Sequence, residues 1–225
     1  MSLTQLLAQG GPVMYVLLLL SVLACAIVLL KLWQFFLCGQ RRHAFIEPVL
    51  GALQRNDVAL SARMLQEVRS PVARVMLTAV TCSGDPAMGT ANVEAEIARV
   101  GSAEIRTLES FLRGLSAIAH LSPLLGLFGT VTGMIRAFMQ VQTAGDRVQV
   151  SMLAGGIWEA LLTTAFGLAV ALPAMAAYYL LEGEVDRTRA VMKDASVRVL
   201  THFGRKAASG VPEAAGGRGE DYDGL

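Results

Sequence analysis

The sequence has little charge. Only 16% of its 225 residues are Asp, Glu, Lys or Arg, whereas an ordinary soluble domain carries about 25%. The formal net charge of +1 provides no strong basic or acidic field, so the composition does not point to nucleic acid as a partner. Hydrophobic residues make up 54% of the chain and gather in a few long runs, which favours a membrane protein over a large soluble core.

Residues that would mark an enzyme or a metal protein are also scarce. The three cysteines, Cys25, Cys38 and Cys82, are odd in number and lack metal or redox spacing, which predicts reduced, structural thiols. The sequence contains no recognisable nucleophile–base set, phosphate-binding loop or metal-ligand cluster. It therefore predicts no enzyme, no cofactor and no metal.

Basic residues are absent from residues 1–11, so this segment lacks the start of a secretory signal peptide. The apolar run that follows exceeds a typical signal core, and Lys31 and Trp33 come after it as expected interfacial anchors. A retained first span is the favoured interpretation. The alternative is a lipoprotein, for which "VLAC" would predict cleavage before Cys25.

Three apolar runs, at 12–30, 114–135 and 157–181, each have about the 20 residues that are needed to cross a hydrocarbon core. A buried helix of a soluble protein rarely stays apolar on all faces for so long. The sequence therefore predicts an all-α membrane protein with three transmembrane helices.

Lysine and arginine are unevenly distributed around these runs. Ten lie within 31–113 and seven follow the third run, whereas the connection 136–156 holds two and the N-terminal segment none. Because basic residues favour the cytoplasmic side, we expect 1–11 and 136–156 to lie outside. The loop 31–113 and the extension 182–206 are then cytoplasmic.

The expected cytoplasmic segments have helical periodicity. Asp57 is a candidate N-cap, Pro71 predicts a break, and the stretch 82–90 is rich in turn residues. No strong breaker stands between Thr90 and the second span, so we expect one continuous helix there, and the third span likewise continues through its extension. The Gly- and Ala-rich end, 207–225, is expected to be disordered.

Small residues form a stripe on each of the last two spans. Small residues let membrane helices approach closely, so these spans are expected to pack tightly with the first span outside them. Such stripes suit a closed ring of identical subunits, and the absence of an internal repeat argues against a secondary transporter. The candidate packing residues include Gly126, Gly129, Gly133 and Gly167, together with Ser122, Ala137, Ala160, Ala171 and Ala174.

Glu159 is the one acidic residue inside the third run. Carboxylates in membrane helices usually face a bundle interior or a hydrated cavity. Counting residues from the outer side places Thr130 at a similar depth, Thr163 one turn further along and Thr164 beside it, which predicts an inward polar strip. The alternative is that Glu159 lies at the interface, where it snorkels or caps the helix N-terminus, and that each threonine bonds its own backbone or a neighbour.

Two stretches, "LSPLLGLFGTVTGMIRAF" at 121–138 and "GGIWEALLTTAFGLAVALPA" at 155–174, resemble the proton-channel subunits ExbB and TolQ, which are distantly related to the flagellar stator subunit MotA. The predicted topology matches this family over nearly the whole chain. Two positions depart from the pattern: Gly156 stands where the family often has proline, and Trp158 stands where it has a small residue.

The resemblance implies a multi-pass subunit of the bacterial inner membrane, with a periplasmic N-terminus and a cytoplasmic C-terminus. Such subunits form a pentameric ring around a dimer of a single-span partner, ExbD or TolR, and proton flow moves this partner to pass force through TonB or TolA. The family pattern assigns Glu159, Thr130 and Thr164 to the proton pathway. On an ideal helix Thr163 is more nearly in line with Glu159, so both threonines remain candidates.

An ExbB-like subunit that energises TonB-dependent outer-membrane transport is the leading hypothesis. A TolQ-like subunit of the Tol–Pal envelope-maintenance system is the close alternative, and the short N-terminal segment favours it. A stator subunit would have four spans. A non-conducting membrane scaffold would tolerate alanine at Glu159, and no role is predicted for His120 or Trp158.

Overall fold

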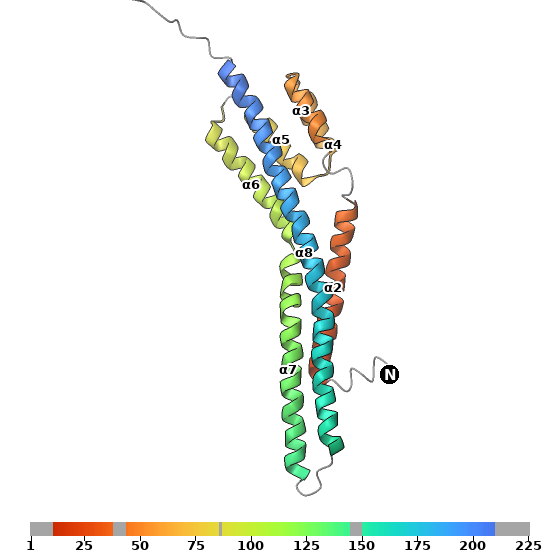
Figure 1. The fold of residues 1–225 in the computed structure, drawn as a ribbon. Coiled ribbons are helices and arrows are strands. Elements are labelled where there is room, and N and C mark those ends of the chain that lie inside the picture. Colours follow the sequence, from red (N-terminus) through yellow and green to blue (C-terminus); the bar gives the residue numbers. More distant parts are fainter. Residues whose placement is uncertain (1–10, 38–43, 86, 145–149, 210–225) are drawn as a thin grey trace, which may run out of the picture. The chain divides into compact units, whose positions relative to one another are not determined.

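The computed structural model describes residues 11–37, 44–85, 87–144 and 150–209, and within these the regular structure is entirely α-helical (Figure 1). The described residues divide into two compact units. One takes its residues from 1–40 and 105–187, and the other from 41–104 and 188–225. Parts of several predicted segments, namely 1–10, 145–149, 210–225 and Cys38, lie outside the described residues.

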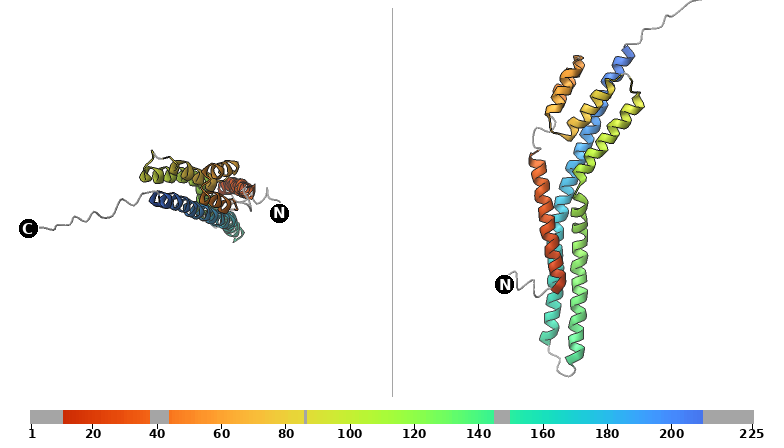
Figure 2. Two further views of the ribbon diagram at one scale, coloured as in Figure 1. Left: turned by 90° about the horizontal axis from the view of Figure 1, so that it is seen from above. Right: turned by 180° about the vertical axis from the view of Figure 1, so that it is seen from behind.

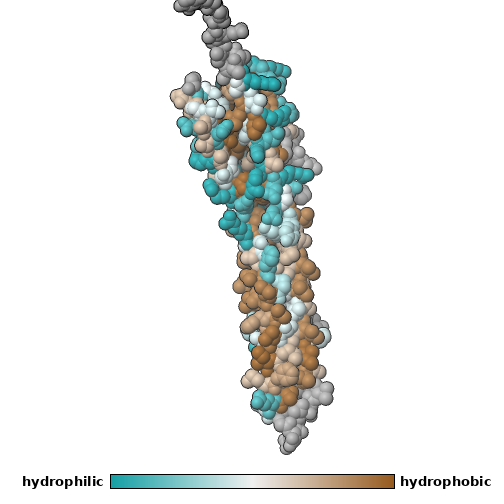
Figure 3. Space-filling model, turned by 60° about the vertical axis from the view of Figure 1, so that its left-hand side comes forward, coloured by the Kyte–Doolittle hydropathy of each residue, from teal (hydrophilic) through white to brown (hydrophobic). Residues whose placement is uncertain are grey.

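The first unit contains α2 (Gly11–Leu37), α7 (Leu112–Ala144) and the first part of α8 (Val150–Ser209). Each of these helices is long and apolar enough to cross a membrane, so the prediction of three such helices is confirmed. Brown, hydrophobic side chains gather over this unit, and teal, hydrophilic ones over the other (Figure 3). The helices run past the predicted apolar runs at both ends, and residues 207–209 belong to α8 rather than to a disordered tail.

Helix α2 buries one narrow stripe and exposes the rest of its apolar surface. The buried side chains are spaced by three or seven residues and so lie along one face, as Met14, Leu17, Ala24 and Ile27. A Cβ atom built on Gly114 of α7 would lie 3.9 Å from Ile27 Cδ1, so this stripe packs on α7. Figure 2 shows α2, α7 and α8 side by side. The exposed leucine and valine side chains are suited to contact with lipid.

Helices α7 and α8 run antiparallel and touch through their small residues. A Cβ atom built on Gly126 would lie 3.1 Å from Thr163 O, and one on Gly133 would lie 3.2 Å from Ala160 Cβ. The two stripes of small residues therefore meet each other inside a single chain. They supply the close contact between two helices of one subunit. They consequently give no argument for contacts between subunits.

The chain breaks between α6 (Thr90–Glu109) and α7, so the expectation of one continuous helix from Thr90 was wrong. Phe111 adopts a left-handed backbone conformation with φ +66°, and its side chain is exposed. The left-handed conformation costs a non-glycine residue about 1–2 kcal/mol. Neither residue at the break, Ser110 or Phe111, is a glycine or proline, so the sequence gives no signal of it.

Lys31 stabilises the C-terminal end of α6 through a hydrogen bond. Its ammonium group donates a 2.8 Å hydrogen bond to Leu108 O and a 3.2 Å hydrogen bond to Gln34 Oε1. The last carbonyl groups of a helix lack intrahelical partners and favour a nearby positive charge. Lys31 is buried and caps a helix from a distant segment of the sequence, whereas Trp33 is exposed.

The second unit contains α3 (Ile46–Gln54), α4 (Val58–Glu67), α5 (Pro71–Ser83), the larger part of α6 and the last part of α8. Pro71 occupies the first turn of α5, as the predicted break requires, and α8 continues unbroken through the predicted extension. Cys25 and Cys82 form no disulfide with any residue that the structure describes. The core of this unit includes Val49, Leu53, Leu65, Val75, Met76, Val80, Ala195 and Val199.

Asp57 is confirmed as the N-cap of α4, because its Oδ1 accepts a 2.9 Å hydrogen bond from Leu60 N. Replacing Asp57 by alanine should lower the free energy of unfolding by about 1 kcal/mol, since it removes the acceptor for an otherwise unpaired N–H group. Thermal unfolding of the purified protein, followed by circular dichroism, measures this loss. Asp57→Asn keeps a capping oxygen and should retain most of the stability. Equal losses in the two variants would contradict the capping role.

Candidate functional site

Glu159 lies well inside α8. The helix begins at Val150, so Glu159 is in its third turn. The favourable interaction of an acid with a helix N-terminus is confined to the first turn. Glu159 therefore does not cap the N-terminus of its own helix.

The carboxylate of Glu159 pairs with Arg136 of α7. Arg136 Nη1 lies 3.2 Å from Glu159 Oε1, and the two side chains are 51% and 29% exposed. In the sequence, Arg136 is one of the two basic residues of the connection 136–156, and its pairing with Glu159 was not predicted. The antiparallel register that sets Gly133 against Ala160 brings Arg136 and Glu159 to the same level, and this register was the signal that could have revealed the pair.

The first residue of α2 adjoins this ion pair. A Cβ atom built on Gly11 would lie 3.1 Å from Arg136 Nη1 and 3.4 Å from Glu159 Oε1, and Gly11 has φ +64°. Both the space and the backbone conformation therefore favour glycine. The first N–H groups of a helix lack intrahelical partners, and their positive partial charge favours a carboxylate nearby. All three apolar helices thus contribute to the surroundings of Glu159.

Thr163 and Thr164 face α7, and both donate hydrogen bonds to backbone carbonyl groups. Thr163 is only 1% exposed, and its Oγ1 donates to Ala160 O at 2.7 Å. A Cβ atom built on Gly129 would lie 2.5 Å from this Oγ1, so Thr163 fills the contact between the helices. Thr164 is partly exposed, and its Oγ1 donates to Gly126 O at 3.2 Å.

Thr130 lies within one helical turn of the level of Glu159. Its neighbour Gly129 contacts Thr163, which is four residues beyond Glu159 along α8. Thr130 is one residue closer than Gly129 to the level of Glu159 because the helices are antiparallel, so with a rise of about 1.5 Å per residue the separation along the helix is about 4.5 Å, less than one turn. Thr130 is partly exposed, and its Oγ1 donates to Leu127 O at 2.7 Å.

A sequence model of the MotA/TolQ/ExbB proton channel family matches residues 66–194. The chain belongs to this family. The match spans more than half of the protein and includes every residue of the site on α7 and α8 described above. The resemblance seen in the two membrane stretches is therefore confirmed over a much longer part of the chain.

Individual proteins named for ExbB or TolQ align with most of the chain or with a shorter stretch of it. An ExbB-like biopolymer transport protein of Synechocystis sp. is 30% identical over 164 residues, which are 72% of this chain and 77% of that protein. The biopolymer transport protein ExbB of Neisseria meningitidis is 27% identical over 216 residues, or 89% of this chain and 98% of its own. The Tol–Pal system protein TolQ of Haemophilus influenzae is 47% identical over 75 residues, or 33% of this chain and 32% of its own.

His120 and Trp158, for which the sequence predicted no role, both lie on helices that are apolar enough to cross a membrane. His120 is exposed on α7, and its Nδ1 donates to Ser116 O at 2.7 Å. Trp158 precedes Glu159 on α8 and is 53% exposed. Within the ranges that the structure describes, no three His, Cys, Asp or Glu side chains gather as metal ligands.

Proposed function

We propose that this protein is the channel-forming subunit of a proton-driven motor in the bacterial inner membrane. The observation that carries the proposal is the placement of Glu159, which is paired with Arg136 and adjoins the start of α2, on helices that are long and apolar enough to cross a membrane. A charged side chain at membrane depth is costly and is usually retained for function. Membership of a proton channel family supports the same function.

In the proposed cycle Glu159 is the group that takes up and releases the proton. Protonation removes the negative charge that holds Arg136, so proton transfer and rearrangement of the ion pair are coupled. One proton that crosses 100 mV releases about 2.3 kcal/mol, which is the energy available for each such step. Thr130 and Thr164, whose side chains are partly exposed, are proposed to line the pathway, and Thr163 is proposed to hold α7 against α8.

The resemblance to ExbB and TolQ suggests the remaining parts of the motor. We propose a homo-oligomeric ring, pentameric as in the family, that encloses an ExbD- or TolR-like single-span partner and acts on a TonB- or TolA-like force transmitter. The N-terminus would be periplasmic and the C-terminus cytoplasmic. Large apolar side chains remain exposed on α7 and α8, which supports further contacts with lipid or other subunits; they include Leu124, Phe128, Val131, Ile135, Phe138, Leu161, Leu168 and Leu172.

An ExbB-like role in TonB-dependent transport is the first candidate, because proteins named for ExbB align with most of this chain. A TolQ-like role in the Tol–Pal system is the second candidate, because TolQ of Haemophilus influenzae is 47% identical over a shorter stretch of 75 residues. Deletion of the gene separates them. Loss of growth on iron chelates supports the first role, and sensitivity to detergent with intact iron uptake supports the second.

Proton conduction itself is tested with the purified complex. The protein is co-expressed with an ExbD- or TolR-like single-span protein and reconstituted into liposomes that contain a pH-sensitive dye. A potassium diffusion potential should drive proton entry only when both proteins are present. An assembled complex that conducts no protons under this potential would overturn the proposal in favour of a passive scaffold.

A further inference from the structure

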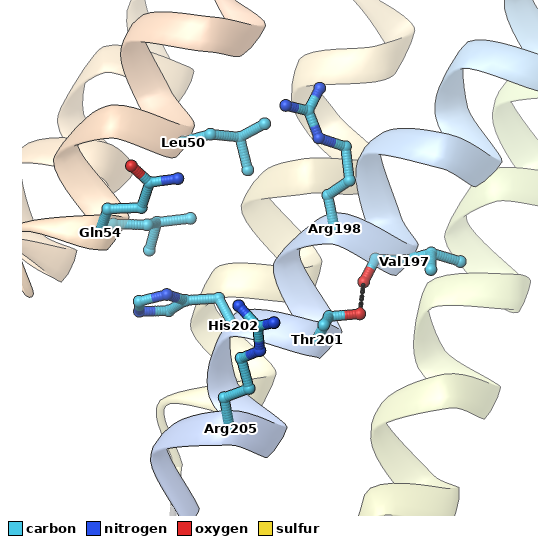
Figure 4. A pocket seen from close by; sticks show the side chains of 8 residues that line it. Leu50, Gln54, Val197, Arg198, Thr201, His202 and Arg205 are labelled. Atoms are coloured by element: carbon cyan, nitrogen blue, oxygen red, sulfur yellow. Dashed lines mark hydrogen bonds between the residues drawn. The ribbon is translucent and has the colours of Figure 1, made fainter.

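A cavity of about 260 Å³ lies within the second unit, between α3 and the last part of α8. We name it the α3–α8 pocket. Its apolar wall and its polar groups come from both helices, as Figure 4 shows. The lining residues are Leu50, Leu53 and Gln54 of α3 and Val197, Arg198, Thr201, His202 and Arg205 of α8.

Basic side chains are concentrated on the α8 side of this pocket. Arg198, His202 and Arg205 are spaced by four and three residues, so they follow one another along the same face of the helix. In Figure 4 the imidazole of His202 is directed from α8 toward the α3 side, from which Gln54 reaches into the same space. The arrangement concentrates hydrogen-bond donors around one small cavity.

The positive charge of Arg198 is neutralised by an ion pair with Glu47. Its Nη1 and Nη2 donate to the two carboxylate oxygens of Glu47 at 2.7 and 3.2 Å. This two-point hydrogen bonding lowers the pKa of Glu47 below its usual value, so the pair is fully charged at neutral pH. Arg205 forms no ion pair with another side chain in the described ranges, and its positive charge therefore remains available at the pocket.

His202 provides a second, independent indication that the α3–α8 pocket holds a ligand. Its Nε2 atom is buried and has no hydrogen-bond partner among the described residues. A buried polar atom without a partner costs about 1–3 kcal/mol and is uncommon in native proteins. The ring also stacks edge-on against Phe203, with centroids 5.6 Å apart. An oxygen acceptor placed in the pocket would satisfy an Nε2–H donor.

We propose that the α3–α8 pocket binds the oxyanion of a small molecule, either a carboxylate or a phosphate. The guanidinium of Arg205 and the imidazole of His202 provide donors for the anionic oxygens, and the Gln54 amide provides a further donor. Leu50 and Leu53 provide an apolar wall for a short carbon body. A volume of about 260 Å³ admits a ligand of several heavy atoms but no folded partner.

Binding is tested on the purified full-length protein in detergent with two probes, inorganic phosphate and benzoate. Isothermal titration calorimetry at constant ionic strength should give saturable binding of at least one probe, and the same probe should raise the unfolding temperature. Saturation by phosphate identifies a phosphate ligand, and saturation by benzoate identifies a carboxylate with an apolar body. Neither measurement requires a membrane potential, so the result is independent of proton conduction.

Three variants locate the binding. Arg205→Gln should weaken the affinity at least tenfold. His202→Phe should weaken it similarly, and the ligand-free protein should be no less stable because the unpartnered nitrogen is gone. Arg63→Gln, which removes an exposed arginine of α4 in the same unit, should leave the affinity unchanged.

Three results would overturn the proposal. One is the absence of saturable binding for both probes. Another is equal weakening in the Arg63→Gln control, which would indicate unspecific ion binding. The third is binding only in a chain shortened after Ser209, which would show that the acidic residues that follow α8 in the sequence already occupy the pocket.

Discussion

Replacement of Glu159 by glutamine should abolish proton-driven work while the protein still inserts and assembles with its partner. Glutamine has nearly the same shape as glutamate and cannot exchange a proton in this role. We expect proton entry into liposomes to fall to the background rate and the cellular function to be lost completely, and alanine at Glu159 should have the same effect. Normal uptake or envelope integrity in cells that carry either variant would contradict the proposed proton pathway.

The ion pair with Arg136 requires a matched control. Glu159→Gln leaves the guanidinium without its partner, and an unpaired charge at membrane depth can destabilise the protein by itself. The double variant with Arg136→Gln removes both charges and should assemble as well as the wild type, yet conduct no protons. A double variant with wild-type proton flux would show that Glu159 is needed only to neutralise Arg136.

Replacement of Gly167 by alanine should force α7 and α8 apart. A Cβ atom at this position would lie 2.7 Å from Ser122 O and 3.0 Å from Gly126 Cα, and these backbone atoms cannot turn aside as a side chain could. Overpacking of this kind costs about 1–3 kcal/mol. It opposes the gain of about 1 kcal/mol that alanine has over glycine in a helix, so we expect a net loss of stability and of proton flux.

Gly183 of the same helix is the control for this substitution, because a Cβ atom built there has no neighbour within 4 Å. Gly183→Ala should leave the unfolding temperature unchanged or raise it slightly. Thermal unfolding in detergent, followed by the helical circular dichroism signal, compares the two variants. If Gly167→Ala is as stable as Gly183→Ala, the close approach of the two helices does not support the fold.

Local chemistry made much of the helical framework predictable. Asp57 and Pro71 mark the starts of α4 and α5 because capping and proline effects act within a few residues. The unbroken length of α8 was predictable because its sequence keeps helical periodicity beyond the apolar run. The break before α7 was not predictable, since Phe111 adopts a backbone conformation that its residue type does not favour.

The residues around Glu159 could not be predicted from the sequence pattern, because they come from distant segments. The carboxylate itself was visible as an acid in an apolar run. Its partner Arg136 is 23 residues away and is identified only when the register of two antiparallel helices is known. Gly11 is still more distant in the sequence, and nothing in its neighbourhood indicates that it adjoins a charge. The glycine stripes were found, but whether they joined helices of one chain or of two required the structure.

The hydrogen bond from Lys31 to Leu108 has a consequence for how the protein is made. The two residues are 77 positions apart. At a synthesis rate of about 5–20 residues per second, Leu108 is added roughly 4–15 seconds after Lys31. During that interval the ammonium group of Lys31 lacks the Leu108 acceptor, whereas Gln34 is only three residues away in the sequence. The first membrane helix therefore reaches its final position only after the end of α6 has left the ribosome and supplies the acceptor.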